Sequence, residues 1–198
     1  MQLLLNTTSP YARIARIALA EKGHADIGTT LVDPWADDPA LLEANAAARV
    51  PALLTDAGRP LTESLLIVLW LESQQPQPSL LGGDPTAVIS RAGIAMGVID
   101  AAVHTLIGRK ITDAGFDESP VGLRRRRTIV QGLSRLEADP PRCESGTPDL
   151  SVIASVVALD YVNFRFPKAA WLPALPQLTG LAARMRSRAS FELSLPRA

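Results

Sequence analysis

The residue best placed to do chemistry in this sequence is Ser9. It follows a short apolar run, Gln2 to Leu5, and precedes Pro10 and an apolar-rich segment that stops at Gly23. Serine is favoured at the cap of a helix, proline at its first residue and glycine just beyond its end. A hydroxyl at this position lies beside free backbone N–H groups and the positive end of the helix dipole. Such a position suits an anion, for example a thiolate, and a simple helix cap is the alternative.

The elements around Ser9 indicate an α/β domain. A strand is predicted before Ser9 and a helix after it, and Ile27–Val32 is predicted as the second strand. A short helix near residues 40–44 comes next, and the strands Arg49–Thr55 and Pro60–Thr62 then form a hairpin. With one more helix after the hairpin, the order is βαβαββα, which is typical of a mixed sheet with helices on both faces.

The segment after the hairpin completes this domain. Ser64 is the predicted cap of the last helix, and Leu65–Leu71 is an unbroken apolar run. An unbroken apolar run predicts a helix that is buried on all sides. Gln74–Ser79 places two prolines among polar residues, which is typical of a linker. We therefore expect the first domain at residues 1–75 and the linker at 76–83.

The second half of the chain, residues 84–198, is predicted to be all-helical. Apolar spacing and capping residues indicate helices at about residues 84–107, 120–137, 149–164 and 173–188. Asp149 is the predicted cap of the third and most apolar of these helices. Four consecutive arginines, 124–127, are interpreted as a solvated helix face, because the formal net charge of the chain is zero.

The composition excludes several classes of protein. The 198 residues are 47% hydrophobic and 20% charged, which predicts a substantial core, and the zero net charge argues against nucleic-acid and membrane partners. A single cysteine, Cys143, cannot form an internal disulfide and fits a reducing compartment. With only His24 and His104, the chain cannot build a multi-histidine metal site. No signal peptide and no apolar run of membrane-spanning length is recognised, so a cytoplasmic protein without a metal is expected.

Three separated motifs in this order resemble those of a known family. Ser9–Arg13 opens the first helix, Arg49–Leu53 opens the third strand, and Glu63 and Ser64 open the third helix. Together with the linker and the helical second half, they resemble the cytosolic glutathione transferases, in the serine-type group common in bacteria. The resemblance covers nearly the whole chain. It implies an N-terminal thioredoxin-like domain that binds glutathione and a C-terminal all-helical glutathione-transferase domain.

The resemblance implies a catalytic hydroxyl at Ser9. In the family, the hydroxyl at this position donates a hydrogen bond to the glutathione thiolate. Three neighbouring residues, Thr7, Thr8 and Tyr11, are alternative donors that the sequence does not exclude. Relatives that reduce disulfides often carry cysteine at this position, so Ser9 argues against a mixed-disulfide mechanism.

The resemblance also implies the residues that hold the rest of glutathione. The backbone of Val50, before a cis proline at Pro51, is expected to pair with the cysteinyl part of the tripeptide like an added strand. Arg49 is expected near the glycyl carboxylate. Glu63 is expected to neutralise the γ-glutamyl ammonium, and Ser64 to hold the γ-glutamyl carboxylate at a helix N-terminus.

The implied reaction is attack by the glutathione thiolate on a small electrophile, with glutathione as co-substrate, in a detoxifying homodimer. The second substrate is expected in a cleft between the domains, and nothing in the sequence identifies it. The alternatives are a glutathione-dependent reductase or peroxidase, and a non-catalytic interaction protein with the same fold. One departure from the family is Met96, where many relatives carry an aspartate.

Overall fold

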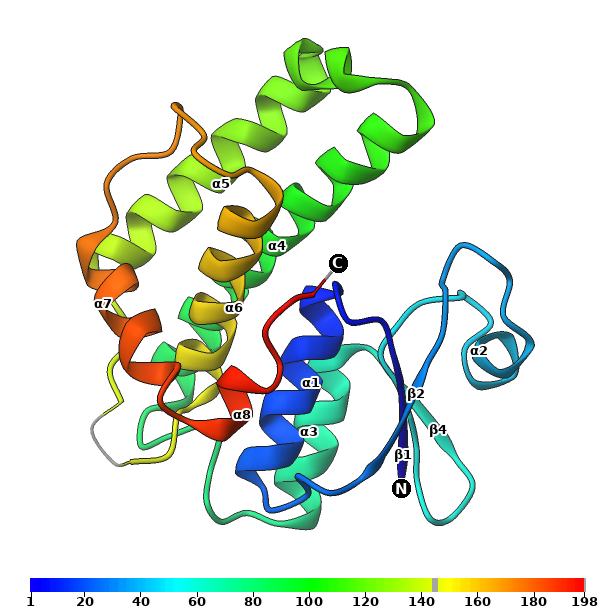
Figure 1. Ribbon diagram of the computed structural model, residues 1–198. Helices are drawn as coiled ribbons and strands as arrows, with labels where there is room; N and C mark the ends of the chain where they lie inside the picture. Colours follow the sequence, from blue (N-terminus) through cyan, green and yellow to red (C-terminus); the bar gives the residue numbers. More distant parts are fainter. Residues whose placement is uncertain (144–145, 198) are drawn as a thin grey trace. The chain divides into compact units, whose positions relative to one another are not determined.

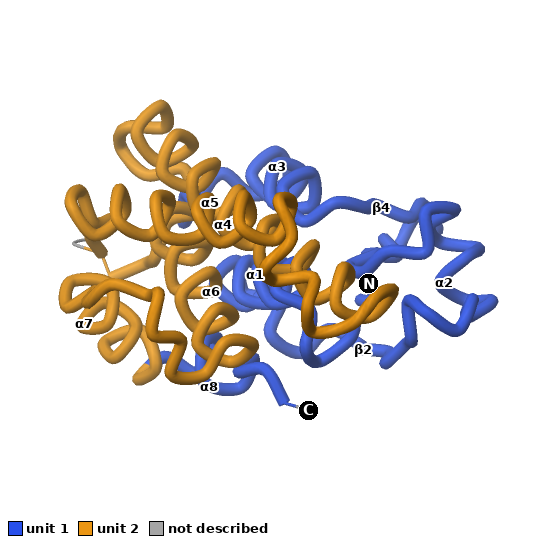
Figure 2. Tube along the Cα trace, turned by 90° about the horizontal axis from the view of Figure 1, so that it is seen from above, with its two compact units in different colours: residues 1–80, 188–198 blue, residues 81–187 orange. Residues whose placement is uncertain are grey.

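The structure is a computed structural model that describes residues 1–143 and 146–197 (Figure 1). It divides into two compact units (Figure 2). The first unit comprises Met1–Leu80 together with the described residues from 188 onward, and the second comprises Leu81–Ser187. Each unit has its own hydrophobic core and is described separately below.

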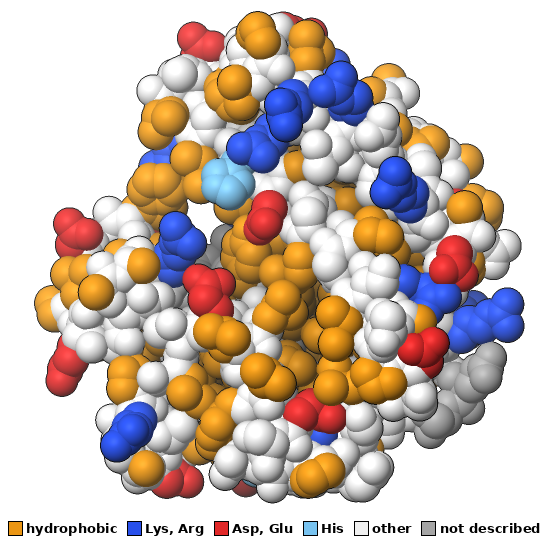
Figure 3. Space-filling model, turned by 180° about the vertical axis from the view of Figure 1, so that it is seen from behind, with side chains coloured by type: hydrophobic (Ala, Val, Ile, Leu, Met, Phe, Trp, Pro, Cys, Tyr) orange, Lys and Arg blue, Asp and Glu red, His pale blue; other side chains and the backbone are white. Residues whose placement is uncertain are grey.

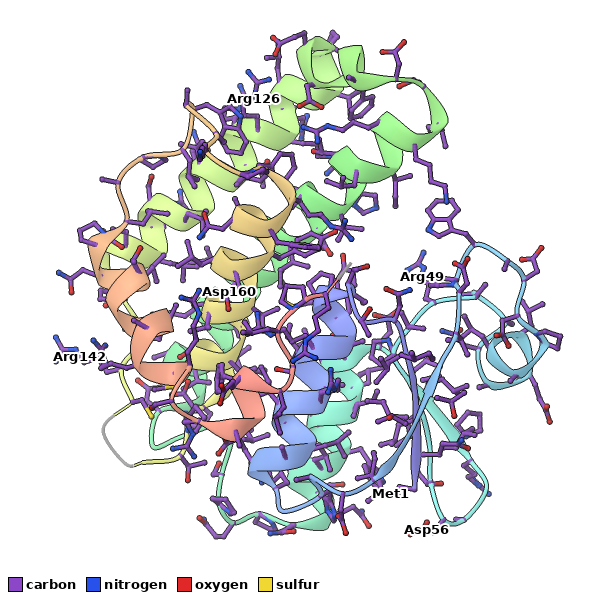
Figure 4. All side chains as sticks on the ribbon, in the orientation of Figure 1. Met1, Arg49, Asp56, Arg126, Arg142 and Asp160 are labelled. Atoms are coloured by element: carbon purple, nitrogen blue, oxygen red, sulfur yellow. The ribbon has the colours of Figure 1, made fainter. Side chains whose placement is uncertain are left out.

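The first unit is built on a four-stranded sheet with the order β2-β1-β3-β4. The strands are Gln2–Leu5 (β1), Gly28–Leu31 (β2), Ala52–Leu54 (β3) and Pro60–Thr62 (β4). β1 pairs parallel with β2 and antiparallel with β3, and β3 pairs antiparallel with β4. The N-terminal ammonium of Met1 pairs with Asp56 in the turn of the β3–β4 hairpin (Figure 4). The mixed sheet and the βαβαββα order confirm the predicted fold class.

Helices cover both faces of this sheet. The helices of the first unit are Pro10–Glu21 (α1), Pro39–Ala44 (α2), Ser64–Gln74 (α3) and the short Ala189–Glu192 (α8), which packs on α1. α1 and α3 pack together on one face, and α2 lies on the other (Figure 1). Leu4 packs with Leu41 and Val50 on the α2 side. Because side chains alternate along a strand, Leu3 and Leu5 face α1 and α3.

The third helix is buried on one side only, which corrects the prediction of burial on all sides. Ile67 and Leu71 are almost fully buried, whereas Leu65, Leu66 and Leu69 are 38%, 57% and 61% exposed. Hydrophobic side chains are visible on the face shown in Figure 3. An apolar run shows that a helix has apolar sides, but the number of sides that neighbours cover depends on the tertiary fold.

The C-terminal segment returns to the first unit, although the sequence places residues 188–198 with the helical domain. Phe191 in α8 is fully buried, and α8 packs against α1. Arg188 donates hydrogen bonds of 3.0 and 2.6 Å to the carboxylate of Glu21. Buried Arg13 donates from Nε to the Ser194 hydroxyl at 3.3 Å. These contacts join residues that are far apart in the chain, so local sequence patterns do not reveal them.

The predicted linker is fixed to the first unit by a buried lysine. Lys22 is 1% exposed and donates to the carbonyl oxygens of Gln75 and Pro78 at 2.7 and 2.6 Å. Its ammonium also pairs with Glu72, whose carboxylate accepts the backbone N–H of Leu80 at 2.8 Å. A buried charge requires such partners, and here they join the end of α1 to the end of α3.

The second unit is all-helical, as predicted. Its elements are Pro85–Ile111 (α4), the 3₁₀ helix Ala114–Glu118 (η1), Pro120–Ala138 (α5), Leu150–Arg165 (α6) and Pro176–Met185 (α7). The stretch between the predicted helices 84–107 and 120–137 contains the last turn of α4 followed by η1. A Cβ at Gly108 would lie 2.4 Å from the Phe116 ring. Glycine therefore lets the aromatic ring of η1 pack closely on α4.

The most apolar helix, α6, forms the core of this unit. Its residues from Leu150 to Val162 are all buried. Asp149 caps it, as predicted, and accepts the Val152 N–H at 3.0 Å and the Ser151 hydroxyl at 2.6 Å. Near the other end of α6, Asp160 is 5% exposed and accepts a 2.6 Å hydrogen bond from Arg186 (Figure 4).

The arginines of α5 lie on a largely solvated face, which confirms the interpretation of the run 124–127. Arg124 and Arg127 are exposed. Arg126 (Figure 4) pairs with Glu118 at 2.5 Å, and its guanidinium lies 5.9 Å from the centroid of the Trp171 ring.

Among the described residues, one helix is long and apolar enough to cross a membrane. This helix is α4, with a mean hydropathy of 1.5 over 18 residues, which corrects the expectation that no segment reaches this length. In the structure α4 packs against α5 and α6 and buries Ala95, Val98 and Ile99. The core helix of a helical unit has the same length and composition, so α4 by itself assigns no membrane location.

Candidate functional site

Ser9 caps α1 as the sequence predicts. Its backbone is extended, with φ −75° and ψ 121°, and its Oγ accepts the Ala12 N–H at 3.2 Å. Pro10 is the first helical residue, and Gly23, with a φ of 85°, follows the end of the helix. The positive φ explains the glycine, because other residues rarely adopt it. The hydroxyl of Ser9 thus lies at the positive end of the α1 dipole.

The hydrogen bonds in the structure distinguish Ser9 from the hydroxyls of Thr7 and Thr8. Thr8 donates its hydroxyl proton to Asn6 Oδ1 at 2.8 Å, and Thr7 donates to the carbonyl oxygen of Arg197 at 3.0 Å. Tyr11 is half-buried in the first turn of α1. Within the described part of the chain, the Ser9 hydroxyl accepts the Ala12 N–H and donates to no protein group. Its proton is therefore available for a bound anion.

Asn6 holds the loop before Ser9, a role that the sequence analysis does not assign. Its side chain accepts the Thr8 N–H at 2.9 Å, and its carbonyl oxygen accepts the Ser9 N–H at 3.1 Å. Asparagine commonly forms such turns with the backbone two residues further on. The signal was thus present in the sequence, three residues before the predicted cap.

The Val50–Pro51 peptide bond is cis, as the resemblance implies. β3 begins at Ala52, three residues later than predicted, so the backbone of Val50 lies outside the ladder that β3 forms with β1 and β4. Asn45 donates from Nδ2 to the Arg49 carbonyl at 2.8 Å and holds this loop. The backbone of Val50 thus lies directly before the start of β3, outside the strand pairings of the described residues.

Glu63 has a strained backbone. Its φ of 66° and ψ of 120° lie in a region that residues other than glycine rarely adopt. Such a residue costs about 1–3 kcal/mol, and strain of this kind clusters at functional sites.

The N-terminus of α3 differs from the prediction. Glu63, rather than Ser64, occupies the cap position, and Ser64 is the first helical residue, 2% exposed. Among the described side chains none caps α3, whereas Ser9 caps α1 and Asp38 caps α2. The first N–H groups of α3 therefore lack a side-chain acceptor, and a carboxylate can supply one.

Arg49 and Glu63 come from different motifs and lie together. Arg49 Nη1 is 3.8 Å from Glu63 Oε1, and their side chains are 74% and 58% exposed. Arg49 lies on the loop before β3 (Figure 4). An exposed pair of this kind adds little stability, so both charges remain accessible to a ligand.

The sheet register brings all three motifs to one end of the first unit. Leu4 pairs with Ala52, and Ala52 pairs with Thr62. β1 runs toward this end and continues to Ser9, β3 starts from it after Val50 and Pro51, and β4 runs toward it and continues to Glu63. Among the described residues, the structure therefore gathers at this end an available hydroxyl, a backbone segment at Val50 outside the ladder, a helix N-terminus without a side-chain cap, and two charges.

The two other residues noted in the sequence lie in the second unit. Met96 is half-buried on α4, and Cys143 is half-buried in the loop after α5. Among the described residues, no three His, Cys, Asp or Glu side chains are grouped to hold a metal ion.

Several known proteins resemble this chain in sequence and in fold. Residues 8–74 match the family model of the glutathione S-transferase N-terminal domain. A solved glutathione S-transferase from Methylobacterium radiotolerans, in complex with glutathione sulfonate, is 33% identical with a TM-score of 0.89. The similarity covers 100% of this chain and 95% of that one. The chain belongs to the glutathione S-transferase family.

Other members of the glutathione S-transferase family are similar over most of the chain. A solved transferase from Methylobacillus flagellatus with glutathione bound is 30% identical, has a TM-score of 0.84 and covers 99% of both chains. The maleylacetoacetate isomerase of Pseudomonas aeruginosa is 33% identical over 190 residues, which are 89% of this chain and 87% of that protein. The uncharacterised GST-like protein YibF of Escherichia coli is 29% identical over 203 residues, 99% of this chain and 98% of that protein.

Proposed function

We propose that this protein is a glutathione transferase that conjugates the glutathione thiolate to small electrophilic molecules. One observation carries the proposal. The Ser9 hydroxyl, the backbone of Val50 directly before the β3 ladder and the N-terminus of α3, which no described side chain caps, lie at the same end of the first unit. Two relatives with 33% and 30% identity were solved with glutathione sulfonate and glutathione bound, which supports glutathione as the ligand.

The Ser9 hydroxyl would stabilise the thiolate. A free thiol has a pKa of about 8.5 and is only a few per cent ionised at neutral pH. Lowering this pKa by about 2 units, worth about 2.7 kcal/mol, makes most of the thiol nucleophilic. A hydrogen bond from Ser9 and the positive end of the α1 dipole both favour the charged form.

The other residues would position the tripeptide. The backbone of Val50 pairs with the cysteinyl residue and fixes the place of the sulfur. The γ-glutamyl carboxylate fits the free N–H groups at Ser64, and Glu63 binds the ammonium beside it. Arg49 then faces the glycyl carboxylate. The strained backbone of Glu63 directs its carboxylate and the start of α3 toward one ligand.

A second candidate function is glutathione-dependent isomerisation, which the relative named maleylacetoacetate isomerase favours. In this reaction the thiolate adds to one carbon of a double bond, the resulting single bond rotates, and the thiolate leaves as the double bond reforms. The same Ser9-bound thiolate serves both reactions. Conjugation consumes glutathione, whereas isomerisation regenerates it.

Retention on immobilised glutathione, followed by turnover assays, tests the proposal. We expect retention, and steady consumption of glutathione with a generic aryl halide. Conversion of a cis unsaturated diacid without loss of glutathione would instead support the isomerase. Reduction of a small disulfide would support the reductase, and absence of both retention and turnover would leave the non-catalytic interaction protein.

We also propose a cytoplasmic homodimer that uses the exposed face of α3. Leu65, Leu66 and Leu69 leave apolar area in water that a second copy would cover. Light scattering at micromolar concentration should give about twice the chain mass of 21.1 kDa, and Leu69→Glu should reduce it to one chain. A wild-type monomer would refute the dimer. The cytoplasmic location rests on the single cysteine, which fits a reducing compartment.

A further inference from the structure

The first unit contains a cavity that shares no residue with the proposed glutathione site. Its volume is about 140 Å³, and its walls come from the second half of α1, the loop before β2 and the C-terminal segment with α8. Figures 1 and 2 show α8 close to α1. The cavity is open to solvent on one side, and its lining includes polar residues, among them His24, Thr29 and Ser190. A space of about 150 Å³ is large enough to hold benzene. The space therefore suits one small ring or a branched chain of similar size.

The floor of this cavity is apolar. Leu3 and Leu19 line it and are 1% and 2% exposed, and Ile27 adds a half-buried side chain. Leu193 lies at the cavity and is 66% exposed, so a ligand seated there would remove its side chain from water. Burial of apolar area at this site favours a ligand with an apolar body.

The wall of the cavity carries a cation, Arg16. Its Nη2 donates to the Leu193 carbonyl at 3.1 Å, which leaves further N–H donors of the guanidinium for another acceptor. Burial, and then the nearby charges of Arg13 and Arg197, lower the pKa of Arg16. The nearby Glu21 is bound by Arg188 and Ser190, and in the described residues no carboxylate pairs with Arg16. A bound anion would relieve the repulsion among these cations.

We propose that this cavity binds a small monocarboxylate with an apolar body, of about the size of benzoate. The carboxylate accepts hydrogen bonds from Arg16, and the ring lies over the floor at Leu3 and Leu19 and covers the exposed side chain of Leu193. The ligand touches both α1 and the C-terminal segment, so it holds that segment on the first unit. Binding to the folded state then raises the unfolding temperature in proportion to the logarithm of ligand concentration.

The test uses the full chain with saturating glutathione, so that benzoate cannot bind in the proposed glutathione site. Calorimetric titration with sodium benzoate at constant ionic strength should show saturable binding of one molecule per chain. Benzamide keeps the shape without the charge, and acetate keeps the charge without the ring. Both should bind at least about tenfold more weakly: benzamide because a hydrogen bond to a neutral acceptor is weaker than one to a carboxylate, and acetate because it buries much less apolar area.

Three variants locate the binding. Arg16→Gln should weaken benzoate binding about tenfold to a hundredfold. Ala20→Leu fills the cavity from α1 with a strong helix former and should abolish benzoate binding while the charge of Arg16 remains. This variant keeps the test valid if Arg16→Gln does not fold. Arg124→Gln, at an exposed arginine of the second unit, is the matched control and should leave benzoate affinity unchanged.

Several results would overturn the proposal. These are a linear, non-saturating titration, equal affinity for benzamide, or benzoate affinity that Ala20→Leu leaves unchanged. Loss of benzoate binding when glutathione is added would also overturn it, because the two ligands would then share a site. The proposal does not depend on the transferase assignment, since binding of benzoate can be measured in a chain that fails to bind glutathione.

Discussion

Replacing Ser9 by alanine removes two interactions with one change. The first is the cap on the Ala12 N–H, at 3.2 Å, and loss of a serine cap costs about 1 kcal/mol of stability. The second is the proposed donor to the thiolate, and loss of a hydrogen bond to a charged group costs about 1.5–3 kcal/mol. If the second loss falls on the reacting thiolate, turnover with an aryl halide should drop about tenfold to a hundredfold.

The assay follows the ionisation of the sulfur directly. The ultraviolet absorbance of bound thiolate, titrated with pH, should show the pKa of the bound thiol rising by about 1–2 units in Ser9→Ala, which is the same free energy expressed on the pH scale. Glutathione affinity should change much less, because Val50, Glu63 and Ser64 still hold the rest of the tripeptide. The effect should therefore appear in turnover and titration rather than in binding.

Ser119→Ala is the matched control for the loss of a cap. Ser119 caps α5 in the second unit, accepts the Gly122 N–H at 3.0 Å and donates to the Phe116 carbonyl at 2.6 Å, so this variant should lose at least about 1 kcal/mol of stability. Its turnover and thiolate titration should stay at the wild-type values. If Ser9→Ala also matches wild type in both, then Ser9 is only a helix cap, and Thr7, Thr8 or Tyr11 must supply the donor.

Further measurements test the strain, the core helix and one ion pair. Glu63→Gly should raise the free energy of unfolding by about 1 kcal/mol, because glycine tolerates the positive φ. Its glutathione affinity, measured by calorimetry, should fall because the carboxylate is lost. A lower free energy of unfolding would show that the backbone of Glu63 is not strained. Asp149→Ala should lower the unfolding free energy by about 1 kcal/mol, because the Val152 N–H loses its acceptor, and an unchanged denaturation midpoint would place the cap elsewhere. Hydrogen bonding from Arg109 lowers the pKa of Asp117 from its usual value of 3.8. The stability from this pair is therefore present above that value and lost as pH falls through the lower folded pKa. Asp117→Asn should thus lower the free energy of unfolding at neutral pH but approach the wild-type value in strong acid. Urea unfolding at a series of pH values measures this, and a difference between variant and wild type that does not change with pH would refute it.

The sequence by itself determined the local structure and the family. The cap at Ser9, the proline after it, the glycine at residue 23 and the cap at Asp149 follow short-range rules of helix ends, and the structure contains all of them. The order βαβαββα followed from apolar runs and turn residues. Three motifs at the right spacing then indicated glutathione transferases, because each motif depends on a few adjacent residues.

Only the tertiary structure decided which surfaces are covered and which residues meet. The apolar run of α3 did not reveal that Leu66 and Leu69 remain in water, because that depends on the neighbours of the helix. Arg49 and Glu63 lie 3.8 Å apart although they belong to different motifs, and Glu63 adopts a positive φ that no local sequence rule predicts. The helix that contains buried Phe191 packs against α1, so residues near the two ends of the sequence are in contact. Periodicity reports which side of an element is apolar, whereas contacts between distant residues form only when the whole unit packs.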